Sequence, residues 1–408
     1  MKFYQLSAKD RRKILNDEGI ELEKIDDEVL EKLNNLSENV IGQLCLPLGV
    51  VQSLNVNDAN YMVPMATEEP SVIAAANHGA SIFNKNGGVV ASSDRSGIYG
   101  QIVMAIEDDF DLALVEKIQV ALIKEANDKF SSLVNHGGGL RKIEFSLKNV
   151  NQQKLLYALC LIDPAEAMGA NKANSILEFL AQKLLAVRGI SEKLYAILSN
   201  YPSQLTTAKV ELDFASVGGK EVAERVALLS KIGQIDPYRA VTNNKGIMNG
   251  VDAVLLATGN DYRAIEAASA VLASQNGYTS LSRWIIKDQK LVGELTLPMA
   301  IGAVGGSINA RSDVKQAFNI LNPTNRISVK DLANVITSIG LANNLAALFA
   351  ISTVGIQEGH MKLQARNLVA SLNVPESEKE KVLKQLIKDK IYTKEHVQEI
   401  LKEISEDK

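Results

Sequence analysis

The pattern of apolar and polar positions predicts a chain that mixes helices and strands. Leu and Ile recur at helical spacing over residues 8–36, whereas residues 39–67 have the Val, Asn, Gly and Pro content of strands and turns. A helix is predicted to open at Pro70 and to end at the 86–88 turn. From about residue 220 onward, alanine-rich helical periods dominate. The fold class is therefore α+β.

The stretch from about 89 to 210 has a different pattern. It predicts a strand, a long helix, two strands and a second long helix, an order that resembles a ferredoxin-like unit. The tail at 375–408 is dense in Lys and Glu, with apolar residues at helical spacing, and predicts a small charged helical appendage.

One uncharged run, 333–357, is long enough to cross a bilayer. It contains Asn334, Asn343, Asn344 and Gln357, and each is costly in hydrocarbon. A helix buried in a large core is the preferred interpretation. The N-terminus is polar and mixed in charge, without the apolar segment of a signal peptide.

Composition narrows the class of protein. The 408 residues have a net charge of −4, which offers no general footprint for nucleic acid or a membrane surface. The 2 cysteines and 4 histidines have no ligand spacing, so neither a disulfide framework nor a metal site is predicted. We expect a reduced, cytoplasmic enzyme.

Glycine-rich signals are present in uncommon forms. The chain contains no G-x-G-x-x-G and no G-x-x-x-x-G-K-[ST], so neither a Rossmann fingerprint nor a P-loop is supported. The string EAMGAN at 166–171 directly precedes a predicted helix, whose free N–H groups could bind phosphate. The three glycines at 137–139 favour a turn between helix and strand over a phosphate cradle.

Seven uncommon strings occur in order along the chain: ENVIG at 38–42, EEPSV at 68–72, EAMGAN at 166–171, DPYR at 236–239, NKGIMNG at 244–250, ATGND at 257–261 and GIQEGHM at 355–361. Together they resemble class II 3-hydroxy-3-methylglutaryl-coenzyme A (HMG-CoA) reductase, the soluble bacterial and archaeal form. The resemblance covers about residues 36 to 370.

The resemblance implies reduction of HMG-CoA to mevalonate and CoA with two NAD(P)H, in the mevalonate pathway of isoprenoid biosynthesis. Lys245 matches the family's cation beside the carbonyl oxygen, and Glu69 matches its proton donor. Asp261 matches the aspartate that bridges them, and it is also a predicted helix N-cap. His360 matches the histidine that protonates the departing thiolate.

Binding residues also follow from the resemblance. Those that match positions holding the hydroxymethylglutaryl group are Ser71, Arg239 and Asn249. Those that match nucleotide-binding positions are Glu166, Met168, Gly169, Ala170, Asn171 and Asn200. Glu166 replaces the family's usual aspartate, and its side chain is longer by one carbon.

The choice of nicotinamide coenzyme has a physical basis. Enzymes that use NADH commonly place an acid on the ribose 2′-OH, where it repels the phosphate of NADPH. In an NADH-specific relative an aspartate precedes the three glycines by seven residues, and Phe130 stands there in this chain, beside Asp128 and Lys129. We therefore predict NADPH, with NADH as the alternative.

The resemblance also implies the organisation. A large, mainly helical domain that binds HMG-CoA is expected at 1–92 and 204–352, with an inserted ferredoxin-like nucleotide-binding domain at 93–203. A C-terminal helical flap at 353–408 carries the histidine. A homodimer with its active site at the subunit interface is expected, and assembly beyond the dimer stays open.

Two alternatives remain on the sequence. The same enzyme could run oxidatively in mevalonate catabolism, because residues do not set the direction of flux. A non-catalytic protein that binds CoA or nucleotide is disfavoured, since the chain retains all four matched catalytic residues.

Overall fold

The computed structural model describes residues 2–306, 308, 311–322, 326–353, 365–366, 368–372 and 374–406. The internal contacts divide the chain into one unit at Met1–Pro47 and a second at Leu48–Lys408. The first unit contains a 3₁₀ helix at Phe3–Gln5 and two helices, α1 (Ala8–Asp17) and α2 (Asp27–Asn34).

A buried arginine holds the first unit together. The Arg11 guanidinium donates to the backbone carbonyls of Phe3, Leu6 and Val40 and to the side chain of Asn34. A charge that is 4% exposed is tolerable here because several acceptors satisfy its N–H groups. The helices predicted over 8–36 are confirmed.

The second unit begins with a hairpin and a helix. Strands β1 (Leu48–Val56) and β2 (Ala59–Ala66) pair antiparallel, and β1 packs against α3 (Val72–Lys85). The helix starts two residues later than predicted. Ser71 precedes it with φ of 72°, outside the right-handed helical region, so Pro70 cannot belong to the helix.

A four-stranded antiparallel sheet lies in the main core, in the order β3-β8-β10-β9. Its strands are β3 (Val90–Ser93), β8 (Leu205–Asp213), β9 (Ser282–Lys287) and β10 (Lys290–Pro298). The accompanying helices are the 3₁₀ helix Phe214–Val217, α7 (Lys220–Ile235), α8 (Pro237–Ala257), α9 (Tyr262–Ala273), α11 (Ser312–Leu321) and α12 (Val329–Ser352).

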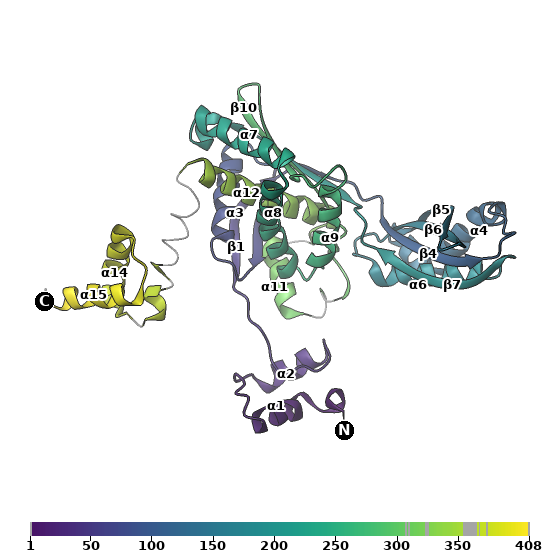
Figure 1. Cartoon of the computed structure of the whole chain (residues 1–408), viewed down its shortest axis with the longest axis horizontal. Helices are drawn as coiled ribbons and strands as arrows, with labels where there is room; N and C mark the ends of the chain where they lie inside the picture. Colours follow the sequence, from purple (N-terminus) through teal and green to yellow (C-terminus); the bar gives the residue numbers. More distant parts are fainter. Residues whose placement is uncertain are drawn as a thin grey trace. The chain divides into compact units, whose positions relative to one another are not determined.

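Helix α12 runs through this core and packs against both α3 and α8 (Figure 1). By length and composition it could cross a membrane, but 78% of its most apolar window is buried inside the protein. One of its buried amides is held on both sides: Asn344 accepts from the Trp284 indole N–H at 2.7 Å and donates to Asn243 at 2.9 Å. These features agree with the core helix predicted for 333–357 as far as residue 352, and residues 354–357 lie outside the described residues.

The chain between β3 and β8 forms its own sheet and its own hydrophobic core. Its order is β4 (Ile98–Ile106), α4 (Ala113–Lys129), α5 (Ser131–Asn135), β5 (Gly139–Val150), β6 (Gln153–Asp163), α6 (Ala170–Leu184) and β7 (Ile190–Ser199). The strands pair antiparallel in the spatial order β5-β6-β4-β7, and both long helices contact the sheet and each other. The predicted succession of strand, helix, two strands and helix is confirmed, and β7 completes it.

Two helices end the described chain, α14 (Glu376–Asp389) and α15 (Lys394–Glu406). They share a small apolar cluster that includes Val382, Leu386, Val397 and Ile400. The helical appendage predicted at 375–408 is confirmed as a pair of helices over these residues.

Candidate active site

A cleft of about 370 Å³ opens between the start of α3, the face of α8 and the second half of α12. Five residues that the sequence singled out line it: Glu69, Ser71, Arg239, Lys245 and Asn249. They are far apart in the sequence, from residue 69 to residue 249, and lie together only because the chain folds.

The helical repeat explains the α8 side of the cleft. Arg239, Thr242, Lys245 and Asn249 are three or four residues apart, and such positions share one face of a helix. Asp236 accepts from the Tyr238 N–H at the helix start, which fixes where this face begins.

Lys245 and Glu69 meet directly. The Lys245 ammonium donates to Glu69 Oε2 at 2.5 Å, and the two side chains are 59% and 38% exposed. Glu69, which the resemblance singles out, lines the cleft, and its neighbour Glu68 does not. The result is a cation and a carboxylate in contact and open to a substrate.

The rest of the cleft supplies polar and apolar surface. Arg239 is half-buried, and burial lowers the pKa of its guanidinium below the ordinary value. Ser71 directly precedes α3 and lines the cleft, and its backbone is in the left-handed region. Non-glycine residues adopt this conformation at a cost in free energy, and it is often found at functional sites.

Sequence reasoning missed the opposite wall. It consists mainly of small or aliphatic side chains from α3 and α12, with two amides of α12 beside them: Val72, Ala75, Asn343, Asn344, Ala346, Ala347, Ala350 and Ile351. The recurrence of alanine four residues apart on α12 is the available signal, but the uncharged run by itself predicts only a buried core helix.

Asp261 lies elsewhere. Its carboxylate accepts from the Ala264 N–H at 3.2 Å and lies 3.5 Å from Arg263, so the predicted N-cap role is confirmed. Among the described residues no hydrogen bond joins Asp261 to Lys245 or Glu69, and Asp261 does not line the cleft. His360 lies outside the described residues.

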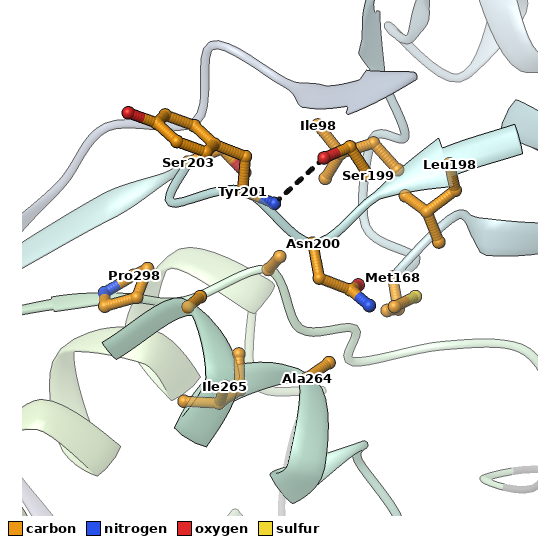
Figure 2. A pocket seen from close by; sticks show the side chains of 12 residues that line it. Ile98, Met168, Leu198, Ser199, Asn200, Tyr201, Ser203, Ala264, Ile265 and Pro298 are labelled. Atoms are coloured by element: carbon orange, nitrogen blue, oxygen red, sulfur yellow. Dashed lines mark hydrogen bonds between the residues drawn. The ribbon is translucent and has the colours of Figure 1, made fainter. Parts of the chain in front are cut away.

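A second, smaller cavity of about 10 Å³ brings together two of the predicted nucleotide-binding residues, Met168 and Asn200. Figure 2 shows Asn200, in the segment after β7, pointing toward Met168, with Ala264 and Ile265 of α9 across from it. The turn that holds Asn200 is closed by the Tyr201 N–H, which donates to Ser199 Oγ at 3.2 Å (Figure 2).

The remaining predicted nucleotide-binding residues surround the start of α6. Gly169, with φ of 90°, precedes the helix, and Ala170 and Asn171 are its first residues. Among the described residues no side chain caps this end, so its first N–H groups are available to an anion. Glu166 instead accepts from the Val329 N–H at 2.7 Å and thereby caps the start of α12.

Basic residues near the three glycines already have partners. Arg141 pairs with Asp163 at 2.9 Å, and Lys142 pairs with Glu144. Lys129 lies 4.3 Å from the centre of the Phe179 ring. Among the described residues no group of three or more His, Cys, Asp or Glu could hold a metal ion.

Comparison with known proteins identifies the family. The family model for hydroxymethylglutaryl-coenzyme A reductase matches residues 7–365. The chain belongs to this family. An HMG-CoA reductase from Archaeoglobus fulgidus is 35% identical over 98% of this chain and 94% of its own length. A probable HMG-CoA reductase from Borreliella burgdorferi is 36% identical over 91% of this chain and 87% of its own length.

Solved structures agree. HMG-CoA reductase from Streptococcus pneumoniae superposes with a TM-score of 0.75 at 36% identity, covering 98% of this chain and 99% of that one. A second structure of the class II enzyme from the same organism, bound to NADPH in open conformations, gives 0.74 at 37% identity, with 98% and 100% covered. This member of the HMG-CoA reductase family therefore has the class II fold.

Proposed function

We propose that this protein is a cytoplasmic, homodimeric HMG-CoA reductase that converts HMG-CoA to mevalonate and CoA with two NADPH. The observation that carries the proposal is the cleft in which Lys245, in contact with Glu69, stands beside Ser71, Arg239 and Asn249. Membership of the HMG-CoA reductase family gives the reaction, and the cleft supplies side chains that suit it.

Lys245 serves as the fixed cation. Hydride addition to a thioester carbonyl turns its oxygen into an anion, and an ammonium already in place lowers the barrier without reorganisation. The contact with Glu69 holds the lysine side chain in the cleft, so its charge is oriented before substrate arrives.

Glu69 serves as the proton donor to the same oxygen. A carboxyl group suits this role once it is protonated, because the Lys245 ammonium contacts Glu69 here and an oxygen bound by that ammonium would also lie near the carboxyl group. The ion pair seen here is then replaced by hydrogen bonds from both groups to the substrate oxygen.

The other polar residues hold the acyl group. The guanidinium of Arg239 can grip the distal carboxylate with two parallel hydrogen bonds. Ser71 and Asn249 offer a hydroxyl and an amide to the substrate's oxygens. The alanine-rich wall leaves room for a slender thioester arm and excludes water from it.

The nucleotide site proposed here lies at the start of α6 and at the cavity beside Met168 and Asn200. NADPH supplies the hydride when bound. The uncapped start of α6 suits its pyrophosphate, and Met168 and Asn200 border the adjacent cavity. The preference for NADPH is supported by the NADPH-bound relative from Streptococcus pneumoniae. Since Arg141 and Lys142 are paired with acids, a 2′-phosphate would have to compete for them.

The proposed organisation follows the family. Residues 93–203 form the ferredoxin-like nucleotide-binding domain, residues 1–92 and 204–352 form the large domain, and 353–408 form the flap that delivers His360. The strand order β5-β6-β4-β7 and the separate core support the first assignment. The position of Asp261 outside the cleft supports a site completed by a second copy.

The decisive experiment measures oxidation of NADPH by the purified chain in the presence of HMG-CoA and counts coenzyme consumed per thioester. Two per thioester are expected, because full reduction to the alcohol takes two hydrides. Absence of thioester-dependent oxidation would refute the function. A higher kcat/KM with NADH than with NADPH would refute only the coenzyme preference.

A further inference from the structure

The segment at 299–304, directly after β10, is bound to both connections between the β4–β7 sheet and the rest of the unit. On the incoming connection, the Arg95 guanidinium donates to Met299 O at 2.8 Å and to Ile301 O at 3.4 Å. On the outgoing connection, Gln204 O accepts from the Met299 N–H at 3.1 Å.

The same segment lies directly against the nucleotide-binding loop at 166–171. The Ala303 N–H donates to Glu166 O at 2.9 Å, and Ala167 pairs in parallel with Val304. Next to these contacts, Gly302 approaches so closely that an added Cβ would lie 2.5 Å from the Met168 nitrogen. The loop therefore rests on the backbone of Gly302.

One side chain clamps Gly302 from the other side. Asn260 Nδ2 donates to Gly302 O at 3.2 Å, and Asn260 Oδ1 accepts from the Gly302 N–H at 2.9 Å. Asn260 also donates to Thr258 Oγ1 at 3.1 Å, which fixes the amide orientation. Asn260 immediately precedes Asp261, the N-cap of α9.

We propose that Asn260 is a positioning residue of the reaction: through Gly302 it fixes the nucleotide-binding loop at 166–171 relative to Asp261. The chain of contact is continuous, from the Asp261 turn through the Asn260 amide to Gly302 and on to Met168. These contacts thus fix the distance between the Asp261 carboxylate and a coenzyme bound at the 166–171 loop. This inference rests on the proposed function.

The first test substitutes Asn260→Ala in the full-length protein. Loss of two backbone hydrogen bonds corresponds to roughly a tenfold effect. We expect the KM for NADPH to rise about tenfold and kcat to fall, while the KM for HMG-CoA stays within about twofold. Gly302→Ala probes the same contact from the loop side and should give the same split, because its Cβ would displace Met168.

Asn84→Ala is the matched control. Asn84 makes the same pair of backbone bonds elsewhere, donating to Ser53 O at 3.0 Å and accepting from the Asn55 N–H at 2.9 Å. It lies on α3, outside both cavities. An unchanged KM for NADPH in Asn260→Ala, or the same split in Asn84→Ala, would overturn the inference.

Fluorescence titration of NADPH onto the same variants, without HMG-CoA, measures coenzyme binding apart from turnover. If the wild-type chain binds NADPH but does not turn over HMG-CoA, the proposed function fails while this inference is still tested. We expect Asn260→Ala to weaken NADPH binding about tenfold. Equal dissociation constants for the variant and the wild type contradict the inference.

A pH series with Asn260→Asp separates positioning from general destabilisation. When protonated, the introduced carboxyl can donate to Gly302 O and accept from its N–H, as the amide does. When ionised, it faces a carbonyl oxygen that it cannot bond. The ratio of the variant's NADPH dissociation constant to that of the wild type should therefore rise as the pH increases from about 3.5 to 8, because the introduced carboxyl ionises above its ordinary pKa of about 3.9. A ratio independent of pH contradicts the inference.

Discussion

Replacing Lys245 by Met should separate catalysis from stability. The substitution keeps an unbranched side chain and removes the ammonium that contacts Glu69 at 2.5 Å. With the two side chains 59% and 38% exposed, that ion pair contributes only about 0–1 kcal/mol to folding. A preoriented cation at a developing oxyanion contributes far more to the barrier, on the order of 3 kcal/mol, or 10²–10³ in rate.

The expected result is a fall in kcat of about 10²–10³ with a change in unfolding free energy below about 1 kcal/mol. The assays are NADPH oxidation at saturating HMG-CoA and urea unfolding at one fixed protein concentration.

Lys183→Met is the matched control for this prediction. Lys183 contacts Glu125 at 2.6 Å with side chains 46% and 49% exposed, and it lies near the end of α6, away from its start. The control should change neither quantity. A loss of kcat below about tenfold in Lys245→Met, or an equal loss in Lys183→Met, would refute the role given to the cation.

Three further predictions concern stability and the tail. Burial and the neighbouring Glu266 raise the pKa of Asp252 to about 8, so the folded chain holds a proton that the unfolded chain releases near pH 4. The free energy of unfolding should therefore fall as the pH rises from about 4 to 8, and Asp252→Asn should flatten that slope in urea titrations. Asn344→Leu leaves the buried Trp284 indole N–H without its acceptor and should lower the unfolding free energy by about 1–3 kcal/mol. Deleting 375–408 should depress kcat far more than it changes the dimer measured by sedimentation.

Local patterns predict most of the fold, because hydrophobic periodicity and the residues that end helices and strands indicate the same elements. Strand-like segments and two long stretches with helical periodicity predict the elements of the β4–β7 sheet up to α6, but not the order in which the strands pair. The start of α3 was wrong by two residues. Proline is favoured in a first helical turn, but the left-handed backbone at Ser71 is a tertiary feature without a local signal.

The residues of the cleft were found by resemblance, and their spatial relation was not. Helical spacing puts Arg239, Lys245 and Asn249 on one face of α8, but only the fold shows that α12 closes the opposite side. Long-range partners are invisible to periodicity. Glu166 is another example. The resemblance matches it to a nucleotide-binding position, and nothing in the sequence predicts its hydrogen bond to the start of α12.

The distance between Asp261 and Lys245 within one chain bears on how many copies of the chain form the active site. The Asn260 N–H bonds to Leu255 O, which lies ten residues beyond Lys245 on α8, and a helix rises about 15 Å over that length. Asp261 can therefore act on Lys245, as the resemblance implies, only if a second copy supplies it.

Mixed dimers test this demand. In a dimer of one Lys245→Met chain and one Asp261→Asn chain, a site built from two copies leaves one intact centre, with Lys245 from the second chain and Asp261 from the first. A site built within one chain leaves none. Co-expression with two different affinity tags isolates the mixed dimer, and each parental homodimer serves as the inactive baseline. We expect about half of the wild-type kcat per dimer, because one of two equivalent centres is intact. Activity no higher than that of the two parents would place Asp261 outside the reaction or within the same chain's site.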